Sequence, residues 1–365
     1  MNRPARNGEF DFWKLVGAVC ILLVHSYTVF GKEHVVARFS FLAVEFFFMV
    51  SGWLFAASIH KDSRPFSLDT IGSESWSFLL KKVKGFAPYY VFGFVLALIA
   101  KCLLTNFLVL FPKNITGVFF DLVLLKEAGI PYVDVEGISW YLSSMLIAMY
   151  LLYPAFRFRK TFFQTYMAPL LAIWLLGLLF LDSKSIAYGI AKPFGIVTAN
   201  TVRAIAEISL GICAHWISEK LRKSSFAERH SHLLSFVGIF AGVAAFGGMT
   251  FMKTGRNIPF IIFLLFVLVS ICGSQAASVN RLFKPSFCSY LGKLSMALFF
   301  THTAIRQGLL CAAKYIPRLQ ALFAARDTGS IATTLTLYLF LSLGLAVFCI
   351  WFCDRLTPQK NVTPS

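Results

Sequence analysis

Charged side chains are scarce in this chain. Only 14% of its 365 residues are Asp, Glu, Lys or Arg, whereas 58% are hydrophobic. A soluble domain has about 25% charged and about 45–50% apolar residues, because polar side chains must cover its surface. This sequence has too few polar residues to cover a water-soluble fold of its length. The composition therefore excludes a soluble globular protein and predicts a polytopic membrane protein.

Metal-binding and disulfide patterns are missing as well. The eight cysteines lie mostly within apolar runs and lack the paired spacing of metal ligands. We interpret all eight as packing residues, because a free cysteine inside an apolar segment behaves as a small hydrophobic side chain. We therefore expect no metal cofactor.

Acidic residues are half as numerous as basic ones. The chain contains 17 Asp and Glu against 34 Lys and Arg, a formal net charge of +17. No nucleic-acid motif accompanies this charge, so we expect it to face anionic lipid and expect no nucleic-acid partner. Lys and Arg are more frequent in the alternating loops that share a side with both chain ends. By the positive-inside rule, both termini are predicted to be cytoplasmic.

Long apolar runs, in contrast, are abundant. A membrane-spanning helix needs about 20 apolar residues, and ten runs of this kind predict an all-α protein with about ten transmembrane helices. The runs are residues 11–30, 39–58, 86–104, 138–156, 166–182, 201–217, 233–251, 258–277, 291–309 and 329–353. Segment 107–125 is interrupted by polar residues and Pro112, and we expect an outer loop that contains a re-entrant or amphipathic piece. We expect one integral-membrane domain over 1–365, without a fused extracytoplasmic domain.

The first predicted span carries three ionisable residues, Asp11, Lys14 and His25. Eleven residues separate Lys14 from His25, which is roughly 16 Å along a helix and returns to within roughly 20° of the same face. Asp11 lies one turn before Lys14 on that face. The helix would present a cation near the cytoplasmic surface and an imidazole in the outer half. Alternatively, Lys14 snorkels to the interface and His25 bonds a neighbouring helix.

The second predicted span contains Glu45 among phenylalanines, followed by Ser51 and Gly52. Buried carboxyl groups in a membrane indicate function more often than chance. Glu45 is either a neutral acid within a site or the interhelical partner of a cation such as Arg203. Ser51 and Gly52 permit close helix packing or a local break.

Two further features stand out along the chain. Lys81, Lys82 and Lys84 precede a helix start that we expect to be broken at Pro88. This basic cluster suits an anionic ligand at the membrane surface, although lipid headgroups would also explain it. His302, in the ninth predicted span, is the second histidine at outer-half depth.

Taken in order, these residues resemble the acyltransferase-3 family of bacterial integral-membrane acyltransferases. The matching residues are Asp11, Lys14 and His25; Phe47, Phe48, Ser51, Gly52 and Leu54; Lys81, Lys82, Lys84 and Pro88; and Gly292, Ser295 and His302. Lys14 departs from the pattern, because the family usually has Arg there. Lysine keeps the charge but lacks the bidentate fork, so phosphate binding at Lys14 would be less geometrically defined.

The resemblance implies ten helices around a core pore in the bacterial inner membrane. It also implies transfer of an acyl group, usually acetyl, from cytoplasmic acyl-coenzyme A to a hydroxyl of a cell-envelope glycan or lipid-linked saccharide. An extracytoplasmic partner, where there is one, would be a separate protein. The expected donor-binding residues are Asp11, Lys14, Ser51, Lys81, Lys82 and Lys84. His25 would be the general base, and Glu45 or His302 would complete the catalytic site.

Two other classes of protein stay open at this point. A transporter or flippase for an anionic, lipid-linked sugar would use the same buried charges as a translocation path. A membrane scaffold or receptor subunit would leave Asp11, Lys14, Glu45 and His25 without a purpose. The sequence has no convincing internal repeat, which counts against the common transporter architectures.

Overall fold

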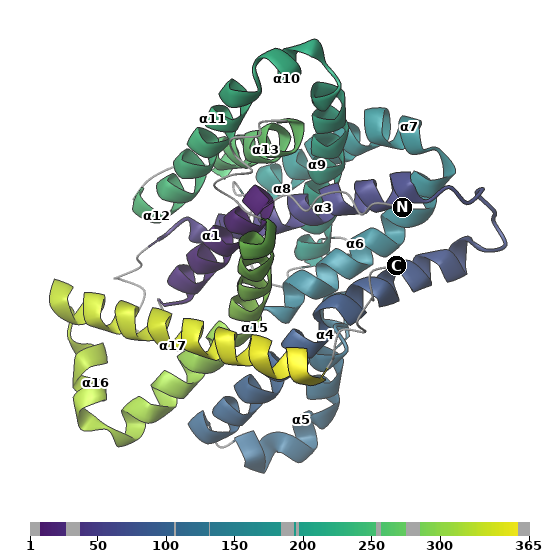
Figure 1. The fold of residues 1–365 in the computed structure, drawn as a ribbon. Helices are drawn as coiled ribbons and strands as arrows, with labels where there is room; N and C mark the ends of the chain where they lie inside the picture. Colours follow the sequence, from purple (N-terminus) through teal and green to yellow (C-terminus); the bar gives the residue numbers. More distant parts are fainter. Residues whose placement is uncertain are drawn as a thin grey trace.

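The computed structural model describes residues 8–26, 37–105, 107–130, 132–183, 193–194, 197–252, 257–274 and 285–356. The two chain ends, the last residues of the first predicted span and those of the eighth lie outside these ranges. The described chain is a bundle of long helices joined by short segments (Figure 1).

Every predicted span contains a helix. These helices are α1 (Gly8–His25), α3 (Ala43–Lys61), α4 (Ile71–Leu104), α6 (Ser139–Phe158), α8 (Ala168–Ser183), α9 (Ala199–Arg222), α11 (Ser231–Gly242), α13 (Asn257–Gly273), α15 (Pro285–Tyr315) and α17 (Thr328–Leu356). Within the described chain, five helical segments are long and apolar enough to cross a membrane: Ser40–Lys61, Ile71–Leu104, Lys160–Asp182, Ser231–Phe251 and Thr328–Leu356. The prediction of a helical membrane protein is confirmed, while the count of ten spans stays a prediction.

Shorter elements connect these helices. They are η2 (Ser40–Leu42), α5 (Phe107–Leu122), η3 (Lys126–Ala128), α7 (Lys160–Phe162), η4 (Phe163–Met167), α10 (Ser225–Arg229), η5 (Val243–Gly247), α12 (Gly248–Phe251) and α16 (Pro317–Ala324). Two π-helical turns, η4 and η5, join their flanking α-helices into continuous rods. The strands in the described residues are two-residue β1 (Pro193–Phe194) and β2 (Val197–Thr198), paired antiparallel just before α9.

Two local predictions, both on α4, need correction. Helix α4 starts at Ile71, inside the segment predicted to be a loop up to residue 85, and it continues through Pro88. A proline removes one backbone donor, and membrane helices tolerate this where neighbouring groups and small local adjustments compensate. Within the segment expected to be an outer loop with a re-entrant or amphipathic piece, residues 107–122 form the helix α5. At 16 residues it is about 24 Å long, shorter than the hydrocarbon core of a bilayer.

Glycines set the closest contacts of the bundle. An added Cβ at Gly52 would collide with the backbone of Ile208, and one at Gly211 would collide with that of Met49. Helices α3 and α9 therefore touch backbone to backbone, and α3 stays continuous through Gly52. Gly93 lies in the same way against Phe300, which brings α4 onto α15. Close packing, and not a helix break, explains Gly52.

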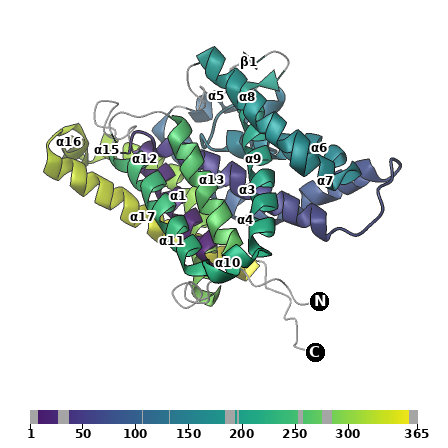
Figure 2. The ribbon, with the colours of Figure 1, turned by 90° about the horizontal axis from the view of Figure 1, so that it is seen from above.

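Helices α1 and α15 lie side by side near the centre, and α17 runs across α15 and α4 on one flank (Figures 1 and 2). The hydroxyl of Ser295 donates to the carbonyl oxygen of Lys14 at 2.8 Å. Lys293 pairs with Asp354 near the end of α17, with 2.8 Å between Nζ and Oδ2. The beginnings of α1 and α15 and the end of α17 therefore lie at the same end of the bundle.

This arrangement gives the predicted topology a direct test. We expect reporter fusions at Lys160 and Ser365 to register as cytoplasmic and a fusion at Asn114 as external, because the basic segments gather at the first two positions. Paired phosphatase and fluorescent-protein reporters would measure the sidedness. A cytoplasmic signal at Asn114 would contradict the ten-helix map.

Candidate functional site

The two histidines expected at outer-half depth meet between α1 and α15. His25 is the last residue of α1, and its Nδ1 lies 2.8 Å from Nε2 of His302. The two imidazoles are nearly parallel, with 9° between the ring planes. His302 is fully buried. Residues 277 positions apart in the chain thus form one hydrogen-bonded pair.

Hydrogen bonding also fixes which ring nitrogens of the neutral pair carry protons. Nδ1 of His302 lies 3.1 Å from the carbonyl oxygen of Leu298, which can only accept, so this nitrogen is the donor. Nε2 of His302 is then unprotonated and accepts from Nδ1 of His25. The lone pair of His25 therefore resides on its Nε2. Such a series of hydrogen bonds orients the His25 imidazole and fixes the tautomer in which it can act as a base.

A large cavity opens at the other end of α1, at the predicted cytoplasmic side. Its volume is about 1150 Å³. Among the described residues, six cationic side chains line it, whereas two acids, Asp11 and Glu219, do. The cations are Lys14, Lys61, Lys81, Lys220, Arg222 and Lys223. Both the volume and the positive charge suit a large anionic ligand.

The predicted donor-binding residues divide into two groups. Asp11, Lys14 and Lys81 line the cavity. Lys14 lies 2.6 Å from Asp11, between Nζ and Oδ1, and its side chain is 22% exposed. Lys82 instead lies 5.4 Å from the centroid of the Phe78 ring.

The other two predicted donor-binding residues also lie away from the cavity lining. Lys84 is exposed on α4. Ser51 is deeper in the bundle, with its hydroxyl 3.3 Å from that of Tyr141. The cavity therefore supports Lys14 and Lys81, together with Asp11, as ligand-binding residues and gives no such support to Lys82, Lys84 or Ser51.

Several cavity residues were missing from the sequence prediction. His60 and His215 stack with 5.4 Å between ring centroids, and the indole of Trp53 lies edge-on to His215. Four of the cations come from Lys61 and from the end of α9. In the sequence, the charge of the loops that contain these residues indicates only which side of the membrane the loops face. Their charge is the available signal, but the packing of α9 against α3, which in turn contacts α1, is needed to interpret these residues as one site.

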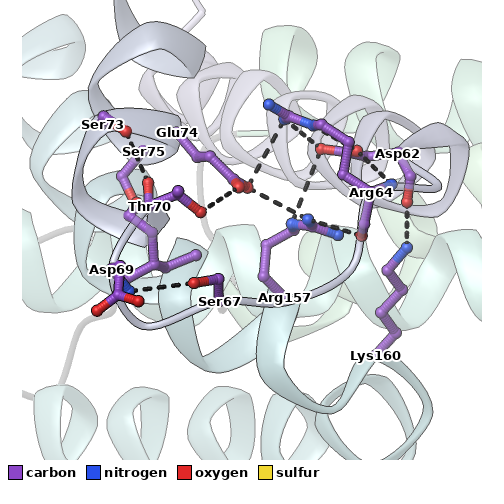
Figure 3. A network of polar contacts seen from close by, with 11 residues as sticks. Asp62, Arg64, Ser67, Asp69, Thr70, Ser73, Glu74, Ser75, Arg157 and Lys160 are labelled. Carbon is purple, nitrogen blue, oxygen red and sulfur yellow. Dashed lines mark hydrogen bonds and ion pairs between the residues drawn. The ribbon is translucent and has the colours of Figure 1, made fainter.

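An ion network holds the segment between α3 and α4 beside this cavity (Figure 3). Arg157, almost fully buried, contacts Glu74 at 3.2 Å between Nη2 and Oε2. Asp62 accepts from Arg64 at 2.9 Å, and Lys160 donates to the carbonyl oxygen of Asp62 at 2.6 Å. The hydrogen bond from Arg64, helped by the charge of Arg157, holds the pKa of the Asp62 carboxyl well below its usual range. The network fixes the chain immediately after His60 and Lys61.

Aromatic rings fill the space between the cavity and the histidines. Phe299 lies 5.8 Å from Phe47, 5.7 Å from Tyr141 and 6.3 Å from His302, measured between ring centroids. On α1, an added Cβ at Gly17 would lie 3.2 Å from the Phe47 ring. The face of α1 between Lys14 and His25 is therefore covered in this conformation. An arm threading along α1 would have to displace these rings.

Glu45 has a partner other than the histidines. Arg203 on α9 forms two hydrogen bonds to the Glu45 carboxylate, one of 3.0 Å from Nε to Oε2 and a shorter one from Nη2 to Oε1. This contact favours the interhelical ion pair over a catalytic role. Glu207, one turn after Arg203, is fully buried, and neither of its carboxyl oxygens has a hydrogen-bond partner. Among the described residues, Arg203 therefore pairs with Glu45 on another helix and not with Glu207, four residues further along α9.

The segment before α6 folds against the outer part of α15. The side-chain amide of Gln307 donates to the carbonyl oxygen of Val135 at 2.9 Å, and Asp121 accepts from the Val135 amide at 2.9 Å. Glu136 follows, fully buried, with neither carboxyl oxygen bonded. Burial, reinforced by the charges of Asp121 and Asp134, raises the pKa of Glu136 well above its usual value. This acid is therefore kept toward its neutral form.

A comparison with family models gives one match across almost the whole chain. A model described as an acyltransferase domain, that of the acyltransferase-3 family, matches residues 7–355. Searches of curated proteins and of solved structures return no match. Groups of three or more His, Cys, Asp or Glu side chains arranged to hold a metal ion are not found in the described part of the chain.

The different surroundings of Glu45 and Glu207 predict different effects of the same substitution. Glu45→Gln should destabilise the protein by about 3–5 kcal/mol, because it leaves Arg203 buried without its counter-charge. Glu207→Gln should change stability by less than about 1 kcal/mol, since no donor bonds that carboxyl group. Thermal unfolding of both variants in the same detergent would compare their stabilities. Equal losses would contradict the assignment of Glu45 as the partner, and adding Arg203→Met to Glu45→Gln should recover stability.

Proposed function

The chain belongs to the acyltransferase-3 family, and on this basis we propose that it transfers an acyl group from cytoplasmic acyl-coenzyme A to a hydroxyl of a cell-envelope or surface glycan. Acetyl is the acyl group we expect, and the bacterial inner membrane is the location. The acceptor glycan, free or lipid-linked, would lie on the far side of the membrane from the donor.

The basic cavity supports the choice of donor. Its volume exceeds the roughly 300–1000 Å³ of common ligand pockets, so an extended nucleotide thioester fits. Coenzyme A carries phosphate groups, which lysine and arginine bind through charge-assisted hydrogen bonds. Lys14 and Lys81 would contact these phosphates, while Asp11 orients Lys14 at 2.6 Å. The carboxyl-terminal end of α9 adds the basic side chains of Lys220, Arg222 and Lys223.

The hydrogen-bonded histidine pair is the single observation that carries the proposed chemistry. His25 Nε2 would remove the proton from the acceptor hydroxyl as the hydroxyl oxygen attacks the thioester carbonyl carbon. His302 holds His25 through the 2.8 Å contact and can stabilise the imidazolium that forms. The carbon–sulfur bond then breaks, and the proton passes to the coenzyme A thiolate. In this mechanism His302 is a positioning residue and Glu45 takes no part.

His25→Gln tests this mechanism most directly. Glutamine keeps a hydrogen-bonding side chain of similar size but cannot take the proton. We expect acyl transfer to fall about 10²–10⁴-fold while the binding of acetyl-coenzyme A changes little. Mass spectrometry of envelope glycans from cells with each variant would measure transfer, and calorimetry of the purified protein would measure binding.

The matched control is His230→Gln, because His230 is exposed and follows α10. It should leave transfer unchanged. If His25→Gln acylated glycans at a near-normal rate, the general-base assignment would be wrong. A loss of folded protein in His25→Gln alone would instead indicate a histidine kept for helix packing.

Two lysines of one helix test the donor site. Lys81 lines the cavity, whereas Lys84, three residues later, does not. Lys81→Ala should weaken coenzyme A binding about fivefold, equivalent to ~1 kcal/mol for a solvent-accessible charge contact. Lys84→Ala should leave the affinity unchanged. Titration of both variants with coenzyme A at two salt concentrations would measure these affinities. Equal losses of affinity in the two variants would indicate general attraction by the basic surface instead of a specific contact with Lys81.

A further inference from the structure

Arg306 lies one helical turn beyond His302 on α15. Positions i and i+4 of a helix share a face, so the Arg306 side chain projects from the same side of α15 as His302. Arg306 also lies within electrostatic range of His302, of His25 and of the Tyr338 hydroxyl. The phenol of Tyr338 in turn donates to the carbonyl oxygen of His302 at 3.3 Å. The guanidinium therefore belongs to the surroundings of the histidine pair.

Within the described part of the chain, no counter-charge accompanies Arg306. The two most buried arginines of the described bundle, Arg157 and Arg203, each contact an acid, Glu74 and Glu45 respectively. Arg306 is half-buried, and no hydrogen bond or ion pair of its side chain is found among the described residues. Its Nε is buried without a hydrogen-bond partner. A buried polar group without a hydrogen-bond partner costs about 1–3 kcal/mol, and more when it is charged, unless a ligand compensates it.

A cation beside a neutral imidazole opposes its protonation, because that would place a second positive charge at the same site. The cation becomes favourable when a negative charge develops there. Acyl transfer generates such a charge, since attack on the thioester moves an electron pair onto the carbonyl oxygen. A preorganised cation that meets this oxyanion stabilises the transition state more than the ground state.

Resting on the proposed function, we propose that Arg306 is the oxyanion-stabilising residue of acyl transfer. The hydroxyl of the acceptor loses its proton to Nε2 of His25, and its oxygen bonds to the thioester carbon. The carbonyl oxygen becomes an oxyanion opposite the Arg306 guanidinium. When the oxyanion collapses, the carbon–sulfur bond breaks and the thiolate takes the proton from His25. The products are an ester and free coenzyme A, with atoms and charge balanced.

Kinetics of Arg306→Gln would test the assignment. The release of free thiol from acetyl-coenzyme A would be followed with purified protein and envelope fragments from cells lacking the gene. We expect kcat to fall about 10²–10³-fold, the effect of losing one oxyanion donor, with KM for acetyl-coenzyme A within about threefold of the wild type. Arg306→Lys should recover at least tenfold of that loss, because it restores the charge without the planar fork.

Controls separate this role from a structural one. Arg306→Met removes the charge without introducing a polar group, and should show the same loss of kcat if the glutamine variant does not fold. Arg318→Gln changes an exposed arginine beyond α15 and should have no effect. A kcat within about threefold of wild type in Arg306→Gln or Arg306→Met would overturn the proposal. So would a rise in the apparent KM for envelope fragments at constant kcat, which would mean that Arg306 binds an anionic acceptor.

Failure of the proposed function would look different. In that case the wild-type protein itself would release no thiol from acetyl-coenzyme A, and the oxyanion role would fail with it. If the wild type is active and the Arg306 variants are equally active, only the role of Arg306 is wrong.

Discussion

The contact between α1 and α15 is the constraint on which the remaining arrangement depends. It is tied at one end by Ser295 against the Lys14 carbonyl group and at the other by His25 against His302. Because α1 is a rigid rod, these two ties hold the basic cavity and the imidazole pair about three helical turns apart. The proposed donor cavity and the proposed reaction centre are therefore two sites on one helix, and α15 closes the second of them.

Buried ionisable side chains in the bundle are either paired with an opposite charge or have atoms without a partner among the described residues. Arg203 with Glu45 and Arg157 with Glu74 are paired, and each pair joins helices that are distant in sequence. Removing one member would strand the other, so such pairs favour a particular helix arrangement more than they add stability. Glu207, Glu136 and Arg306 have buried atoms without partners. An unsatisfied buried polar group costs free energy, and its presence near the histidine pair is what gives Arg306 a functional interpretation.

Helix positions were readable from the sequence because apolar runs of sufficient length have few alternatives in a membrane. The common depth of His25 and His302 was readable for the same reason. Their contact was not, since it depends on α1 and α15 being neighbours. Glu45 shows the same limit: the sequence allowed either an acid within a site or an ion pair with Arg203, and the close contact between α3 and α9 at their glycines decides for the ion pair. The sequence did not predict that Lys81 lines the cavity while Lys84 does not, because this difference depends on α4 beginning at Ile71.

The rings between the cavity and the histidines follow from a physical requirement of a membrane-embedded reaction. A polar passage from Lys14 to His25 would admit water, which competes with the acceptor hydroxyl, and would conduct ions. Phe47, Tyr141 and Phe299 fill this passage with apolar surface and no charge. In the proposed mechanism, opening of this aromatic cluster precedes chemistry, and steps of that kind commonly limit turnover.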